Sequence, residues 1–159
     1  MVYSRELVEQ LEMLGSSPLQ TRVYRHMFGD YLPDRENITG SRWNPPNTRA
    51  IYCGMTRDAC LAEANHYITV QPSRPNARRM LYEIEINLSR VVTFPSWDLL
   101  RAFGADRSIF SGFDHAVTWE IGGAVAWLDN DALMIPSARC DNSNLVIYPE
   151  NQLRTTNFQ

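Results

Sequence analysis

Residues 40–63 bring together three side-chain types that could act on an anionic substrate. The segment GSRWNPPNTRAIYCGMTRDACLAE places Arg42 in a turn rich in proline and asparagine, Tyr52 in an apolar run and Glu63 in a helical pattern. A guanidinium group matches phosphate and carboxylate groups and stays charged when partly buried. A carboxylate can stabilise positive charge that develops on a substrate. A polar loop alone would not need Trp43, so the segment indicates a functional site.

Each of these side chains also has an ordinary structural interpretation. Glu63 could be a solvated helix former, and Arg42 could pair at the surface with one of the 18 acidic residues. Tyr52 in an apolar strand could simply pack in the core. It is the combination of the three in one short segment that favours a site.

The elements around this segment follow from its local pattern. Residues 50–54 (AIYCG) predict a buried strand, and Thr56 is a suitable cap for a helix that runs to about residue 68. Before them, residues 28–49 are rich in Gly, Pro, Asn, Asp and Arg, and a loop this long within a compact domain is functional or disordered. The site would therefore be built on a loop, a strand and a helix in succession.

The rest of the chain mixes helices and strands without regular alternation. We expect helices over residues 4–14 (capped by Ser4 and ended by Gly15), 97–103 and 113–128, strands over 21–26, 78–88, 91–94, 132–135 and 145–148, and a turn over 72–76. Gly122 and Gly123 either weaken the last helix or allow close packing. No G-x-G-x-x-G or G-x-x-x-x-G-K sequence is present, which excludes the Rossmann and P-loop signatures. The 159 residues predict one domain of the α+β class.

Composition limits the possible partners. The net charge of −3 gives no general attraction to a phosphate backbone, so direct nucleic-acid binding is not expected. The 15 basic residues are all arginine, which suits a phosphate site but is equally explained by biased base composition. No apolar run is long enough for a membrane span and the N-terminus lacks a signal pattern, so we expect a cytoplasmic protein without a membrane partner. The three cysteines, Cys53, Cys60 and Cys140, are expected to be reduced.

The segment from Gly40 to Glu63 resembles the RES domain, a family named for an Arg, a Glu and a Ser. Its members carry a G-x-R-W-N-P-P turn, then a strand with a Tyr, then a helix with the Glu. The resemblance extends from residue 22 to about residue 149, with Asn47 standing where glycine is common. Carried over residue by residue, it implies Glu63, Arg42 and Tyr52 as catalytic residues. It implies substrate-binding roles for Arg25, Trp43, Asn44 and Ser137.

The resemblance also implies a fold, an activity and partners. The fold would be similar to the ADP-ribosyltransferase core of bacterial toxins, with mixed β-sheets and flanking helices. The activity would be that of a toxin that depletes NAD⁺ by cleaving its nicotinamide–ribose bond. The resemblance implies no cofactor, and inorganic phosphate would be an optional co-substrate. The partners would be an Xre-type helix-turn-helix antitoxin, NAD⁺ and, compatibly with the sequence, a second copy of the chain.

The chemistry of this bond agrees with the residues present. Loss of neutral nicotinamide leaves a ribosyl cation, which Glu63 could stabilise while bonding a ribose hydroxyl. Arg42 and Arg25 would hold the pyrophosphate, and Tyr52 would stack on nicotinamide or bond its ribose. Ser137 has no His–Asp partner pattern and is interpreted as a binder, not a nucleophile.

Several alternatives stay open at this point. The acceptor could be water or inorganic phosphate, and ADP-ribose could instead pass to a protein or nucleic acid. The chain could also be a nucleotide-binding module without turnover. The histidines His26, His66 and His115 lie far apart in sequence and have no partners at ligand spacing, so no metal site is expected.

Overall fold

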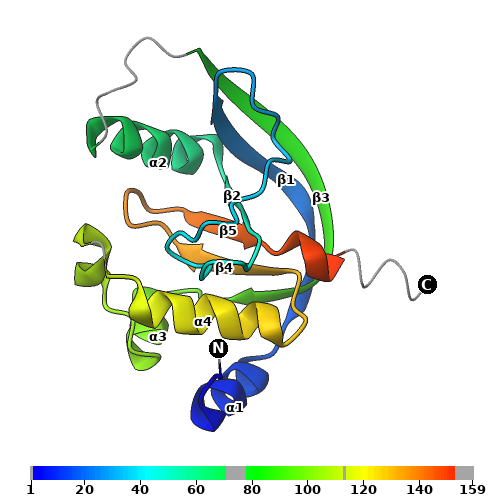
Figure 1. The fold of residues 1–159 in the computed structure, drawn as a ribbon, viewed down its shortest axis with the longest axis vertical. Helices are drawn as coiled ribbons and strands as arrows, with labels where there is room; N and C mark the ends of the chain where they lie inside the picture. The colour runs from blue at the N-terminus through cyan, green and yellow to red at the C-terminus, as the bar shows by residue number, and fades with distance from the viewer. Residues whose placement is uncertain (1, 71–77, 113, 153–159) are drawn as a thin grey trace.

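The fold is built around one closed sheet with helices on its outside (Figure 1). The computed structural model describes residues 2–70, 78–112 and 114–152. The helices are α1 (Arg5–Leu14), α2 (Arg57–Val70), α3 (Trp97–Ala102), the short 3₁₀ helix η1 (Arg107–Ser111) and α4 (Ala116–Trp127). The strands are β1 (Ser17–Phe28), β2 (Ile51–Gly54), β3 (Arg79–Thr93), β4 (Ala132–Pro136) and β5 (Ser143–Ile147). Mixed helices and strands confirm the α+β class.

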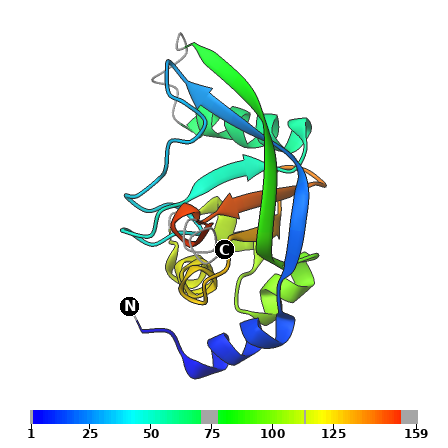
Figure 2. The same ribbon diagram turned by 90° about the vertical axis from the view of Figure 1, so that its right-hand side faces the viewer.

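The sheet closes in the order β1–β2–β5–β4–β3. Neighbouring strands are antiparallel except β3 and β4, which are parallel, so the sheet is mixed as expected. Strands β1 and β3 pair from Ser17 opposite Val91 to Phe28 opposite Arg79 and form a long curved ribbon (Figure 2). The upper half of this ribbon extends beyond β4 and β5 and lies near α2 (Figure 1).

Two apolar clusters occupy opposite faces of the same strands. One cluster has members on all five strands, among them Val23, Cys53 and Leu145, and therefore fills the interior of the barrel. The other contains Val146 and the α4 residue Ile121, and it joins the outer face to the helices. Successive residues of a strand point to opposite faces, which explains how adjacent Leu145 and Val146 serve different clusters.

The helix that carries Glu63 starts against the end of β2. Thr56 caps α2 as predicted, because its Oγ1 accepts a hydrogen bond from the Ala59 N–H at 3.1 Å. A Cβ on Gly54 would collide with the backbone of Cys60, so only glycine permits this close approach of strand and helix. The strand–turn–helix unit therefore fixes α2, and Glu63 with it, beside the barrel.

Most predicted elements are present, with two differences. At the N-terminal helix, Ser4 caps α1 and Gly15 ends it as expected. Residues 91–94 were expected as a separate strand, which is wrong because β3 runs without a break to Thr93. In the sequence, the polar Ser89 and Arg90 look like the end of a strand. In the structure, the Asp131 carboxylate accepts hydrogen bonds from both of their N–H groups, at 2.7 and 3.0 Å. Asp131 thus holds β3 where its pairing changes from β1 to β4.

The last helix begins later than its composition indicates. We expected it to start at residue 113, whereas α4 starts at Ala116 and is preceded by η1, which the sequence did not predict. Asp114 accepts the Ala116 N–H at 2.9 Å and marks the new start. The expected turn at residues 72–76 lies outside the described residues. No helix within the described ranges is long and apolar enough to cross a membrane.

Candidate active site

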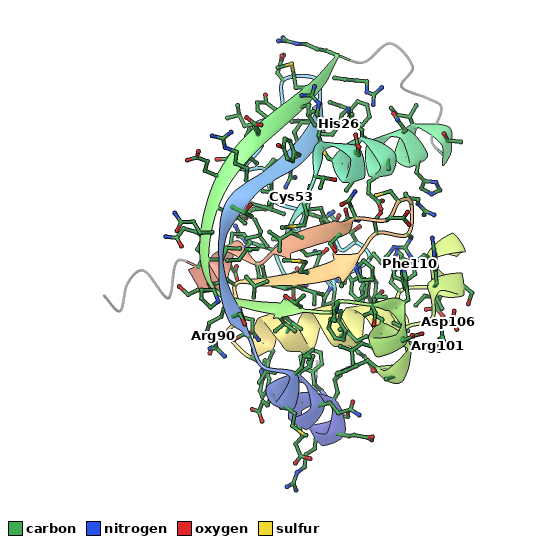
Figure 3. All side chains as sticks on the ribbon, turned by 180° about the vertical axis from the view of Figure 1, so that it is seen from behind. His26, Cys53, Arg90, Arg101, Asp106 and Phe110 are labelled. Carbon is green, nitrogen blue, oxygen red and sulfur yellow. The ribbon has the colours of Figure 1, made fainter. Side chains whose placement is uncertain are left out.

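A cavity of about 960 Å³ lies between the upper half of β1, residues 29–49, α2 and the region of η1. Arg25, Arg42, Trp43, Tyr52 and Glu63 all line it, so five of the seven predicted site residues meet in one place. Figure 3 labels three other lining residues, His26, Cys53 and Phe110, which follow one another from the upper end of β1 down to η1. The volume is at the upper end of the range for small-molecule sites.

Glu63 is held in place by two side chains from the β4–β5 region. Its Oε1 accepts hydrogen bonds from the Ser137 hydroxyl at 3.2 Å and from the Asn144 amide at 3.0 Å. The Ser137 oxygen also accepts the Arg139 N–H at 3.1 Å, and Ser137 is only 1% exposed. Among the residues described, Oε2 of Glu63 accepts no hydrogen bond. The carboxylate therefore has a fixed orientation and one oxygen left for a ligand.

Two arginines converge on the backbone of η1. Arg42 and Arg139 each donate an Nη2–H to the Phe110 carbonyl, at 3.2 and 3.3 Å. The Arg42 guanidinium also lies over the Phe110 ring, 4.5 Å from its centroid. Burial lowers the pKa of Arg42, and the neighbouring charge of Arg139 lowers it further, whereas Glu63 opposes this shift. Two like charges sharing one carbonyl create a positive potential that favours an anion.

Both guanidinium groups retain unused hydrogen-bonding capacity. Arg42 Nη1 and Arg139 Nε are buried and have no hydrogen-bond partner among the described residues. Neither side chain forms a salt bridge within the ranges that the structure covers. A buried donor without a partner is costly, and in a functional site it commonly marks the position of a ligand.

Arg25 lies on β1, on another wall of the cavity. It donates an Nη2–H to the Arg35 carbonyl at 2.7 Å and its Nε–H to the Met27 sulfur at 3.0 Å. Its Nη1 is buried and has no partner in the part of the chain that the structure describes. Burial lowers its pKa, as it does for Arg42. Arg35 stacks on the Tyr31 ring with its central carbon 3.6 Å from the centroid. This wall of the cavity is therefore also cationic and aromatic.

Tyr52 directs its hydroxyl into the turn that bears Arg42. The hydroxyl accepts the Trp43 N–H at 2.9 Å and donates to Asn44 Oδ1 at 2.5 Å. Burial raises the pKa of Tyr52 well above its ordinary value, so the hydroxyl stays protonated. The Trp43 ring is only 2% exposed and packs against Phe110, with 5.8 Å between ring centroids.

Asn44 and Ser137 were expected to bind substrate, but the structure places both beneath the cavity wall. Asn44 is 0% exposed, and its amide donates to the Thr48 carbonyl at 2.7 Å and to Asn37. Ser137 is bonded to Glu63, as described above. Neither of them lines the cavity. Their positions fit support of the turn and of the carboxylate.

The backbone conformation of Asn47 explains why asparagine can replace the glycine that is common at this position. Its φ is +74°, a left-handed conformation that asparagine adopts more readily than most other non-glycine residues. Its N–H donates to the Ile38 carbonyl at 2.9 Å, which closes the loop on itself. The substitution therefore preserves the turn.

Sequence reasoning did not anticipate several lining residues. All three histidines, His26, His66 and His115, line the cavity although they are far apart in the chain. No group of three potential metal ligands occurs in the described part of the chain. Asn144 and the Phe110 carbonyl also escaped notice, because an isolated asparagine or a backbone carbonyl carries no sequence signal.

Two cysteines border the cavity but are poor nucleophiles. Burial raises the pKa of Cys53 to about 12 and that of Cys60 to about 11. A thiol reacts as its thiolate, which is scarce at neutral pH under these conditions. Both are free thiols, as expected. Neither thiol is therefore suited to act as the nucleophile of the site.

Comparison with known proteins agrees with this arrangement. A chain in the crystal structure of the M. tuberculosis MbcT–MbcA toxin–antitoxin complex has the same fold, with a TM-score of 0.78 and 20% sequence identity over 93% of this chain and 85% of that chain. A search of curated protein sequences found no match. The model of the family described as "RES domain" matches residues 21–156, which is most of the sequence. The chain therefore belongs to the RES domain family.

Proposed function

We propose that the cavity binds NAD⁺ and cleaves its nicotinamide–ribose bond. The observation that carries the proposal is one oriented carboxylate, Glu63, in the same cavity as the guanidinium groups of Arg42 and Arg139. Neither guanidinium has a carboxylate partner among the residues that the structure describes. NAD⁺ has the complementary charges, since its pyrophosphate is anionic and its ribose becomes cationic as nicotinamide leaves. The cavity volume of about 960 Å³ is sufficient for a dinucleotide.

In the proposed mechanism, the arginines position the substrate and Glu63 stabilises the transition state. The guanidinium groups of Arg42 and Arg139 bind phosphate oxygens, and the Arg25 guanidinium binds the remainder of the anionic backbone, since all three side chains line the cavity. The free Oε2 of Glu63 accepts a hydrogen bond from a ribose hydroxyl. Its negative charge then offsets the positive charge on the sugar, which is greatest when the bond is nearly broken.

The bond changes balance with either of two acceptors. The electron pair of the C1″–N bond moves to the pyridine nitrogen, and neutral nicotinamide departs. A water oxygen then bonds to C1″ and releases a proton, which gives ADP-ribose. Alternatively, an oxygen of inorganic phosphate bonds to C1″ and gives ADP-ribose 1″-phosphate. Neither reaction needs a further cofactor.

The test compares wild-type protein with Glu63→Gln. Glutamine keeps the size of the side chain and removes its charge, so nicotinamide release should fall by about 100-fold or more. Glu85→Gln is the matched control, because Glu85 is exposed on the outer face of β3 and should leave the rate unchanged. Chromatography in buffers with and without phosphate identifies nicotinamide and distinguishes ADP-ribose from its 1″-phosphate.

Three results would contradict the proposal. Undiminished release by Glu63→Gln would remove the carboxylate from the mechanism. An absence of release by folded, inhibitor-free wild-type protein would favour a nucleotide-binding module without turnover. Release that occurs only when a protein or nucleic acid is present and becomes labelled would show ADP-ribose transfer to a macromolecule.

We also propose that the chain is a toxin that acts on cytoplasmic NAD⁺ and is restrained by an Xre-type helix-turn-helix antitoxin. The proposal is supported by membership of the RES domain family and by the fold shared with a chain of a toxin–antitoxin complex. Expression of wild-type protein should arrest growth and lower NAD⁺, and Glu63→Gln should do neither. Co-expression with the proposed Xre-type helix-turn-helix antitoxin should restore growth, and failure to co-purify with it would contradict the partnership. Size measurement in solution tests whether two copies of the chain associate, which the sequence permits.

A further inference from the structure

The turn that bears Arg42 is held on both sides by side chains from distant elements. The Ser41 carbonyl, which precedes Arg42, accepts a hydrogen bond at 2.5 Å from the indole N–H of Trp119 on α4. The Trp43 N–H, which follows Arg42, donates to the Tyr52 hydroxyl on β2 at 2.9 Å. The Trp43 carbonyl accepts the hydroxyl of Tyr148 at 3.0 Å.

These contacts fix the backbone on either side of the arginine. The Trp43 N–H and the Arg42 carbonyl belong to one planar peptide unit, so a bond to that N–H fixes the plane that follows the Arg42 Cα. The Ser41 carbonyl belongs to the plane that precedes it. With both planes fixed, the φ and ψ angles of Arg42 are determined, and so is the direction of its Cα–Cβ bond.

The Tyr52 hydroxyl has no proton left to donate to a ligand. It accepts one hydrogen bond from the Trp43 N–H and donates its own proton to Asn44, a residue that is 0% exposed. Asn44 is in turn anchored to the Thr48 carbonyl at 2.7 Å. To donate its hydroxyl proton to a substrate, Tyr52 would first have to break this buried network.

We propose that Tyr52 is a positioning residue that acts through Arg42, as one of three members of an aromatic clamp formed by Tyr52, Trp119 and Tyr148. The clamp holds the Arg42 guanidinium against the Phe110 carbonyl and keeps this side chain at the cavity, where it would bind the anionic part of the substrate. This inference rests on the proposed function for the nature of the substrate. It differs from the sequence-based expectation, in which Tyr52 contacts nicotinamide or its ribose.

A double-mutant cycle between Tyr52 and Arg42 tests the clamp. Tyr52→Phe removes only the hydroxyl and should lower kcat/KM for NAD⁺ by about 10- to 100-fold, since small displacements of a positioned group are costly. In an Arg42→Ala background the same change should alter kcat/KM by less than about twofold. Tyr24→Phe is the matched control, because the Tyr24 hydroxyl donates to Glu83 on the exposed face at 3.2 Å, and it should have no effect.

Equal losses from Tyr52→Phe in both backgrounds would overturn the proposal, because Tyr52 would then act independently of Arg42. If Tyr52→Phe does not fold, as judged by thermal unfolding, Tyr148→Phe breaks the clamp at another point and takes its place in the same cycle. Trp119 is left unchanged, because its ring also packs against His115.

A second measurement does not depend on catalysis. In ¹⁵N NMR spectra, Tyr52→Phe should speed hydrogen exchange of the Trp43 amide and increase the mobility of the Arg42 Nε–H group, with Tyr24→Phe unchanged. Unaltered exchange and mobility would refute the clamp even in an active enzyme. If wild-type protein releases no nicotinamide but Tyr52→Phe still causes both spectral changes, the proposed function is refuted and the clamp is supported.

Discussion

Arg42 and Arg139 show how two like charges can be kept together inside a protein. Both donate to the single Phe110 carbonyl, and each has a buried nitrogen with no partner within the described ranges. Such an arrangement is unfavourable in the empty site and becomes favourable when an anion accepts those N–H groups. The local charge pattern thus favours ligand binding over stability of the empty protein.

Arg139 offers a residue-level prediction. Arg139→Lys retains the positive charge but loses the planar fork, so it cannot both hold the Phe110 carbonyl and bind a phosphate oxygen. We expect KM for NAD⁺ to rise by about 10-fold, the cost of one charge-assisted hydrogen bond. Steady-state kinetics measures this. Arg22→Lys, on the exposed face of β1, is the control, and an unchanged KM in Arg139→Lys would remove that side chain from substrate binding.

At the level of elements, helix α4 is pressed against the turn that carries Arg42. A Cβ on Gly122 would overlap the Trp43 carbonyl oxygen and touch the Tyr148 hydroxyl. Of the two interpretations that the sequence left open for this glycine, close packing is the one observed. The helix tolerates a poor helix former because the contact places Trp119 within reach of the Ser41 carbonyl.

Gly122→Ala should therefore destabilise the protein although alanine is the better helix former. Alanine gains about 1 kcal/mol of helix propensity at an exposed site. Here we expect a net loss of about 1–3 kcal/mol in the free energy of unfolding, because the methyl group forces helix and turn apart. Urea denaturation measures the change. Glu120→Ala on the exposed side of α4 is the comparison, and a Gly122→Ala midpoint at or above wild type would contradict the close packing.

At the scale of the whole molecule, the cavity depends on the ribbon of β1 and β3 remaining joined to α2. Arg79 on β3 makes this connection, since its Nε–H donates to His26 Nε2 at 2.9 Å and its Nη2 bonds the Asn65 side chain at 3.1 Å. His26 must be neutral to accept this bond. Burial, followed by the charge of Arg79, lowers its pKa below the ordinary value of 6.5.

Stability should consequently depend on pH in a defined direction. Because the pKa of His26 is lower in the folded state, the unfolded chain binds more protons between the folded pKa and 6.5. The free energy of unfolding should fall as the pH drops from about 7.5 through 6.5 towards the folded pKa. His26→Gln still offers Arg79 an acceptor but does not titrate, so its unfolding free energy should vary less steeply over this range. An identical pH slope in the variant would contradict the assignment.

Sequence alone determined the local elements and the identity of the central residues. Caps at Ser4 and Thr56 and the alternation along β3 are properties of neighbouring residues, and they predicted α1, α2 and most of β3 correctly. Arg42, Tyr52 and Glu63 could be named because they fall within one short segment with a recognisable pattern.

Tertiary structure alone decided what these residues touch. Glu63 bonds Ser137 and Asn144, which lie 74 and 81 positions away, and Arg42 bonds the Phe110 carbonyl 68 positions away. Such contacts arise when the barrel closes and brings the β4–β5 hairpin beneath α2, and no local periodicity encodes them. The hydrogen-bond partners of the Tyr52 hydroxyl could not be predicted either, because they depend on how the loop folds back over β2. Local sequence patterns identify the functional side chains, and closure of the barrel determines which residues they contact.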